Sequence, residues 1–153
     1  MKKLFTLLII AIAAFSVNAA GVMICGKAYN ENSYQLINQE LTEVGYLKSG
    51  SVAYDPVNYK LTLNNADILC DKTIIETYQL EELEIEVIGN CTLKTKKEGN
   101  ENVDNGLSCI NVTAASTKPM TIDFTGNGSL KMTSTNIAFF AFNRYSVQCD
   151  GSI

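Results

Sequence analysis

The 153-residue chain contains no histidine and no tryptophan, has only two prolines, and carries one arginine, Arg144. Without histidine there is no Ser–His or Cys–His nucleophile pair, no imidazole metal cluster and no histidine proton shuttle. Acidic residues outnumber basic ones by 16 to 12, which argues against a nucleic-acid partner, because such a partner selects a basic surface. A hydrophobic content of 46% is typical of a folded domain. Composition therefore indicates one folded domain without histidine-based chemistry.

Residues 1–19 have the layout of a secretory signal peptide, with a basic start, an apolar run and small residues before the expected cleavage between Ala19 and Ala20. The apolar run over 4–15 is shorter than the ~20 residues that a membrane-spanning helix needs. After cleavage, 10 basic and 16 acidic residues give a formal charge of −6. No second long apolar run follows. We therefore expect a secreted, periplasmic or cell-surface protein whose mature chain has no transmembrane segment.

Five cysteines follow the expected signal peptide, and no two of them have the C-x-x-C spacing of a zinc site or redox motif. They are Cys25, Cys70, Cys91, Cys109 and Cys149. In an oxidising compartment they permit two disulfides and one free thiol. The alternative is that most are small buried hydrophobic side chains. The spacing does not choose among the pairings.

A repeat follows residue 50, where apolar and polar residues alternate in a pattern that predicts β-strands. The segment 83–94 aligns without a gap with 120–131, so that Gly89-Asn90 coincides with Gly126-Asn127. A shorter copy covers 61–69, and a fourth begins near 147. Copies of this length predict a β-solenoid of about three to four stacked coils. An antiparallel β-sandwich with hairpin turns at the Gly-Asn pairs is the alternative.

The repeat divides the expected mature chain into two parts. Residues 20–50 form an N-terminal cap, with an edge strand over 23–27 and a short helix within 31–47, because an open solenoid end needs covering. Residues 51–153 form the coils. The polar, asparagine-rich stretch 94–106 is expected to be a loop inserted into one coil, and the C-terminal coil is expected to be incomplete.

The string Y-D-P at 54–56, followed by L-T-L-N-N-A at 61–66, resembles a recurring segment of secreted β-helical proteins from Bacteroides-type gut anaerobes. That family is described as carbohydrate-binding domain-containing. The copies at 83–94 and 120–131 are similar to its next coils, and the likeness covers about 22–153. The resemblance implies a right-handed parallel β-helix of the pectin-lyase-like type and a glycan partner. It implies no catalytic residue.

Outward-facing carboxylates are the first candidate site. Strand alternation turns Glu84 and Glu86 outward, and the repeat alignment places Asn64, Glu86 and Asp123 in one row, with neighbouring strands ~4.8 Å apart. Carboxylates at that distance repel unless a cation or proton lies between them. Glu86 and Asp123 are therefore a candidate calcium site, with a solvated acidic face as the alternative. No other cofactor is expected.

Tyrosines are the second candidate, because sugar-binding sites need aromatic platforms beside polar groups and the chain has no tryptophan. Tyr78 and Tyr145 are placed near coil corners, and together with Glu84, Glu86 and Asp123 they are the expected ligand-binding residues. We therefore predict an exported, non-catalytic β-helix protein that binds carbohydrate. The alternatives are a structural or adhesive protein that pairs strand edges with another chain, and a polysaccharide lyase-like enzyme.

Overall fold

The computed structural model describes residues 20–96, 107–114, 120–134, 137–142 and 145–149. The expected signal peptide with Ala19, most of the expected loop at 94–106 and the end of the chain lie outside these residues, as do the side chains of Tyr145 and Cys149.

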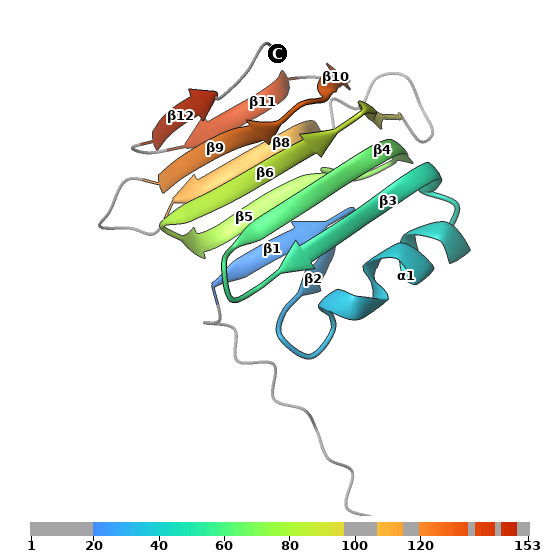
Figure 1. Ribbon diagram of the computed structural model, residues 1–153, viewed down its shortest axis with the longest axis horizontal. Coiled ribbons are helices and arrows are strands. Elements are labelled where there is room, and N and C mark those ends of the chain that lie inside the picture. Colours follow the sequence, from blue (N-terminus) through green and yellow to red (C-terminus); the bar gives the residue numbers. More distant parts are fainter. Residues whose placement is uncertain (1–19, 97–106, 115–119, 135–136, 143–144, 150–153) are drawn as a thin grey trace, which may run out of the picture.

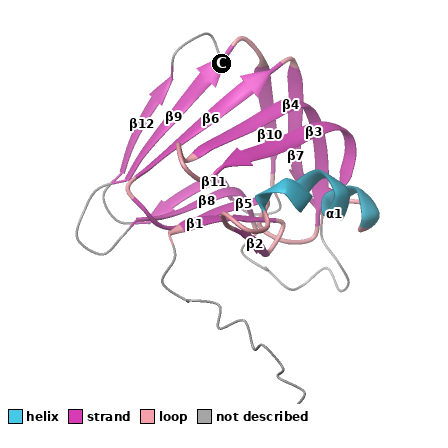
Figure 2. Ribbon diagram, turned by 60° about the horizontal axis from the view of Figure 1, so that its bottom comes forward, coloured by secondary structure: helices cyan, strands magenta, loops and turns pink. Residues whose placement is uncertain are grey.

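The described residues form mainly β-strands, arranged in two facing sheets, with the larger sheet curling over the smaller one (Figures 1 and 2). The smaller sheet has the order β11 (Ile137–Phe142), β8 (Ser108–Ala114), β5 (Ile75–Leu80), β1 (Gly21–Ile24) and β2 (Lys27–Tyr29). The larger sheet has the order β10 (Ser129–Thr133), β7 (Asn90–Thr95), β4 (Lys60–Cys70), β6 (Glu82–Ile88), β9 (Met120–Gly126) and β12 (Tyr145–Cys149). The strand β3 (Leu47–Asp55) belongs to the same sheet and pairs with β4. The chain is therefore predominantly β, as predicted.

Equivalent strands of the repeat lie side by side in parallel. The first half of β4 pairs with β6, and the second half, after Asn65, pairs with β7. The strands consequently form three parallel stacks, which are β4–β6–β9–β12, β4–β7–β10 and β5–β8–β11. Antiparallel pairs among the described residues occur only at the N-terminal end, where β1 pairs with β2 and β5 and β3 pairs with β4.

The register between the stacked copies differs by two residues from the sequence alignment. Leu61 lies opposite Ile85 and not Leu83, while Leu83 lies opposite Ile122 and not Met120. A two-residue slip leaves every side chain on the same face of the strand, so hydrophobic alternation alone cannot distinguish the two registers. The burial pattern is correct in either register, but the partners of the outward residues change.

Close packing at the corner accounts for this register. A Cβ on Gly89 would lie 2.2 Å from the Asn65 side-chain oxygen, and a Cβ on Gly128 would lie 2.3 Å from the carbonyl oxygen of Gly89. The stacked column is therefore Asn65–Gly89–Gly128. The alignment had placed Gly126 over Gly89, because Gly126 and Gly128 stand two positions apart and only Gly126 precedes an asparagine.

The core lies between the sheets and consists of the inward side chains of each stack. Leu61, Leu63 and Ile85 are fully buried in the larger sheet, and Ile75 and Ile110 in the smaller. Burying a side chain of this size contributes about 1.5–3 kcal/mol. Each strand buries only one face, so the coils are stable only when they are stacked.

The N-terminal segment covers one end of the stack. The strand expected over 23–27 is instead a hairpin, because β1 ends at Ile24 and β2 begins at Lys27, and β1 lies between β2 and β5 in place of the sheet edge. The 3-10 turn η1 (Tyr34–Leu36) leads into helix α1 (Ile37–Glu43), which packs on β3 with Ile37 and Leu41 buried. The Asn38 side chain accepts a 2.7 Å hydrogen bond from the backbone N–H of Val52.

The start of the loop expected over 94–106 also differs from the prediction. Lys94 and Thr95 continue strand β7, and Thr95 is buried. The loop expected from residue 94 therefore starts later than predicted.

Candidate functional site

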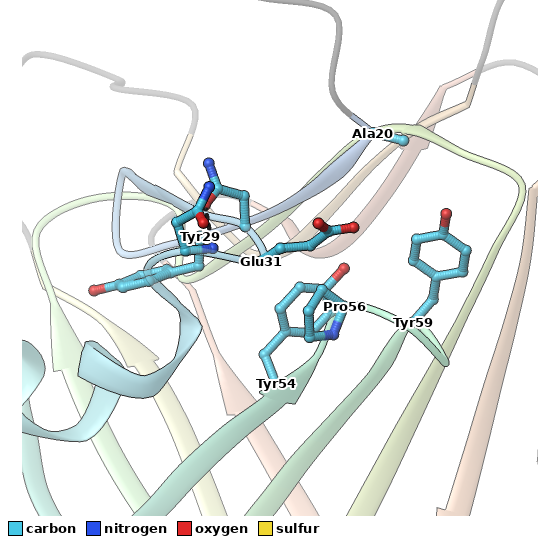
Figure 3. A pocket seen from close by; sticks show the side chains of 8 residues that line it. Ala20, Tyr29, Glu31, Tyr54, Pro56 and Tyr59 are labelled. Carbon is cyan, nitrogen blue, oxygen red and sulfur yellow. Dashed lines mark hydrogen bonds between the residues drawn. The ribbon is translucent and has the colours of Figure 1, made fainter. Parts of the chain in front are cut away.

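A cavity of about 270 Å³ lies where the β3–β4 turn meets the segment after β2 (Figure 3). We call it the tyrosine pocket, and it is lined by Ala20, Tyr29, Asn30, Glu31, Asn32, Tyr54, Pro56 and Tyr59. Figure 3 shows the rings of Tyr54 and Tyr59 on one side and the Glu31 carboxylate directed toward them. The pocket therefore combines aromatic surface with amide and carboxylate groups.

The aromatic side of the pocket is held by an ordered turn between β3 and β4. The Asp55 carboxylate accepts hydrogen bonds from the backbone N–H of Val57 at 2.9 Å and from the Asn58 side chain at 2.7 Å. Donation by Asn58 and by these backbone groups lowers the pKa of Asp55. Tyr59 ends the turn with a left-handed φ of 48°, and its carbonyl accepts from the N–H of Glu84 at 3.0 Å. These contacts place the Tyr59 ring before a ligand arrives.

The polar side is formed by a second turn, which follows β2. The Asn30 side chain accepts a 2.9 Å hydrogen bond from the N–H of Asn32, and the Asn30 N–H donates to the Ser33 hydroxyl at 3.1 Å. Glu31 and Asn32 stand on this turn and are exposed. Tyr29 anchors it from below, because its hydroxyl donates to Glu40 on α1 at 2.8 Å. The turn therefore presents polar side chains from a fixed backbone.

Tyr54 forms the buried floor, with 3% of its surface exposed. Burial raises the pKa of its phenol, with smaller contributions from Tyr59 and Tyr78, so Tyr54 stays neutral at physiological pH. Tyr78, one of the two tyrosines predicted from the sequence, does not line the cavity. It lies in β5 with its hydroxyl over Gly21, next to the rim residue Ala20.

The outward carboxylates occupy a different surface, and Lys60 lies between two of them. The Lys60 ammonium is 3.0 Å from Glu84 and 3.2 Å from Glu86. The Thr125 hydroxyl also donates to Glu84 at 2.8 Å, and donation from Thr125 and Lys60 holds the pKa of Glu84 below its usual range. The positive charge that this row of carboxylates needs is therefore supplied in part by a lysine.

The expected pairing of Glu86 with Asp123 is wrong, because the register places Asp123 beside Glu84 and places Glu86 between Thr62 and Thr125. Asn64, the third member of the expected row, lies opposite Ile88. One carboxylate oxygen of Asp123 is buried without a hydrogen-bond partner. The described residues contain no group of three histidine, cysteine or acidic side chains placed to hold a metal ion.

The structure brings together residues that sequence reasoning did not combine. Tyr54 and Tyr59 flank the Asp55-Pro56 turn, and this Y-D-P-x-x-Y spacing was the available signal, because a tight turn brings its two flanking residues close. Glu31 and Asn32 come from a polar segment that was assigned only to the cap. Of the five expected ligand-binding residues, none of the four whose side chains are described lines the pocket. Tyr78 lies beside the rim residue Ala20, and the backbone of Glu84 bonds to the Tyr59 carbonyl.

Among the described residues, no helix has the length and apolar character needed to cross a bilayer.

Comparison with models of protein families, with curated proteins and with solved structures finds no match for this chain.

Proposed function

We propose that this chain is an exported, non-catalytic carbohydrate-binding protein that holds one sugar unit in the tyrosine pocket. The observation that carries the proposal is the pairing of the Tyr59 ring with the amide and carboxylate groups of Asn32 and Glu31 in one cavity. A pyranose has an apolar face that packs on an aromatic ring and hydroxyls that need hydrogen-bond partners. The resemblance of 54–66 to secreted carbohydrate-binding domain-containing proteins supports the same class of ligand.

The size and charge of the pocket limit which sugars it can bind. About 270 Å³ is close to the lower end of ordinary small-molecule pockets, which begin at roughly 300 Å³, so the ligand is one sugar unit or the end of a chain. Glu31 places a negative charge in the cavity, and the whole chain is acidic. Like charges repel. We therefore expect a neutral or cationic sugar in preference to a uronic acid.

Binding without hydrolysis is the favoured activity because the pocket is lined by a single carboxylate. Glycoside hydrolysis ordinarily uses two carboxyl groups that flank the scissile bond. Glu31 is the one acidic side chain that lines the cavity among the described residues. The nearby carboxylate of Asp55 is occupied by the hydrogen bonds of its own turn.

We propose further that the scaffold is a short right-handed parallel β-helix. The three parallel stacks, each visited once per coil, support this arrangement. Right-handed crossovers are the rule for parallel strands. The N-terminal hairpin and α1 would then serve as its cap.

The test is a glycan array of neutral, amino and uronic sugars, followed by titration calorimetry on the best ligand. We expect Tyr59→Ala to weaken binding about tenfold, since a lost contact of about 1.4 kcal/mol has that effect, and we expect Tyr59→Phe to retain most of it. Val57→Ala is the matched control, because Val57 stands in the same turn and is 78% exposed. Equal binding by Tyr59→Ala and wild type, or no bound glycan, would overturn the proposal.

A structural or adhesive role is the second candidate, and exposed apolar side chains at the opposite end favour it. Ile137, Phe140 and Val147 are 43%, 39% and 42% exposed on β11 and β12, which are the outermost strands of the two sheets. Sheet edges can accept a strand from another chain. Concentration-dependent association that Phe140→Asp abolishes would support this role.

A further inference from the structure

Two thiols meet where the N-terminal hairpin packs against the end of β4. Cys25 lies in the turn between β1 and β2, and Cys70 is the last residue of β4. The backbone N–H of Cys25 donates to the carbonyl of Ile74 at 2.8 Å, which fixes the turn against the segment after β4. The next residue of the turn, Gly26, lies directly on Lys72, because a Cβ on Gly26 would be 2.5 Å from the Lys72 side chain. Both thiols are buried, and they interact with each other.

The other two described cysteines are partnered differently. The Cys91 thiol donates to the carbonyl of Leu63 at 3.5 Å, and the Cys109 thiol donates to the carbonyl of Leu93 at 3.2 Å. Both sit inside the stack and satisfy backbone groups. They therefore behave as small core side chains, whereas Cys25 and Cys70 face each other.

We propose that Cys25 and Cys70 are a disulfide-forming pair, oxidised by a disulfide-bearing oxidant such as a thiol oxidoreductase or oxidised glutathione. A disulfide requires sulfur atoms about 2 Å apart. The packing of the β1–β2 turn on residues 72–74, just after Cys70, holds the two buried thiols in the same part of the core. The bond would join the cap to the first coil.

The exchange balances in two steps. The Cys25 thiolate attacks one sulfur of the oxidant's disulfide, which forms a mixed disulfide and releases the first oxidant thiolate. The Cys70 thiolate then attacks the Cys25 sulfur, forming the Cys25–Cys70 bond and releasing the second oxidant thiolate. The two thiol protons pass to these thiolates, and the oxidant takes up both electrons. Cys25 is suited to the first step because it lines a cavity of about 210 Å³ beside α1.

The interaction with the Cys70 thiol, together with burial, raises the pKa of Cys25. The thiolate is the attacking species in such exchange, so the first step accelerates as the pH rises.

The bond would close the loop 25–70, which contains seven of the eight residues that line the tyrosine pocket, all but Ala20. Closing a loop of this length stabilises a protein mainly by restricting the unfolded chain. For this chain length we expect a melting-temperature increase on the order of 10 °C. The inference concerns the thiols alone and does not depend on sugar binding.

Peptide mapping tests the pairing directly, because each of the five cysteines falls in a different tryptic peptide. Cys25 lies in the peptide that ends at Lys27, and the others lie in 61–72, 73–94, 98–131 and 145–153. The folded full chain is treated with oxidised glutathione, alkylated, digested without reduction and analysed by mass spectrometry. We expect the Cys25 peptide linked to 61–72, with a mass lower by two hydrogen atoms than the separate peptides.

Variants and melting curves complete the test. The linked peptide and the melting shift between oxidised and reduced protein should both disappear in Cys25→Ser and Cys70→Ser and persist in the matched control Cys91→Ser. Wild-type mapping decides the question even if a variant fails to fold. Alkylation of both thiols after oxidation, or a link from either thiol to another cysteine, would overturn the proposal.

Discussion

Replacing Gly89 by alanine tests the stacked corner that sets the register. Gly89 has a φ of +69°, and a side chain in the left-handed region costs roughly 1–2 kcal/mol. The new Cβ would also lie 2.2 Å from the Asn65 side-chain oxygen, which accepts a 3.3 Å hydrogen bond from the Asn90 N–H. Asn65 must move and lose that bond, worth about 1 kcal/mol. We expect Gly89→Ala to lower the free energy of unfolding by about 2–3 kcal/mol.

Gly45 is the matched control. Its φ of +72° is nearly the same, but no atom lies within 4 Å of the Cβ position. Gly45→Ala should therefore show only the backbone strain, about 1–2 kcal/mol. Urea unfolding followed by circular dichroism gives both values, and a double-mutant cycle with Asn65→Ala isolates the contact. Equal losses in Gly89→Ala and Gly45→Ala, with no coupling to Asn65, would refute the stacked column.

Three further predictions concern the charged row, the core and the cap. Lys60→Met should lower the free energy of unfolding by about 0.5–1 kcal/mol at pH 7. Because the pKa of Glu84 is lowered in the folded protein, the stabilisation by Lys60 is present above pH 4.5, the ordinary carboxyl value, and is lost as the pH falls below it. Urea unfolding at several pH values measures this loss. Ile85→Ala should cost about 2–5 kcal/mol, since Ile85 is fully buried, and thermal melting measures the loss; a loss below 1 kcal/mol would contradict that burial. Asn38→Ala should cost about 1–3 kcal/mol by leaving the Val52 N–H without its partner, and hydrogen exchange at the Val52 amide should accelerate; unchanged exchange would argue against this link.

The strands and their inward faces could be predicted from the sequence because alternation has a period of two. Leu61, Leu83 and Ile122 were expected inside and are buried. The register could not be predicted in the same way, since a slip of two residues preserves the alternation. The deciding contact is the packing of Gly128 on Gly89, and a neighbouring Gly126 made the wrong alignment equally plausible by sequence.

The candidate site was harder to predict than the scaffold. Tyr54 and Tyr59 are separated from Glu31 by more than twenty residues, and the path of the cap decides that they meet. Tyr78 was chosen by its place in the repeat and lies beside the pocket rim. The row of carboxylates was predicted as outward-facing, but its members depend on register, so Glu86 and Asp123 were wrongly paired.

The two ends of the strand stack differ in a way that matters for how such a molecule can be lengthened. Antiparallel strands close the end that carries the tyrosine pocket, whereas the remaining pairs repeat one parallel pattern. A duplicated copy of β6, β7 and β8 placed after β8 would find a matching partner on each side. Gene duplication or protein design can therefore lengthen the scaffold by whole coils while the pocket stays unchanged. The length of the strand stack and the ligand specificity of the pocket then vary independently.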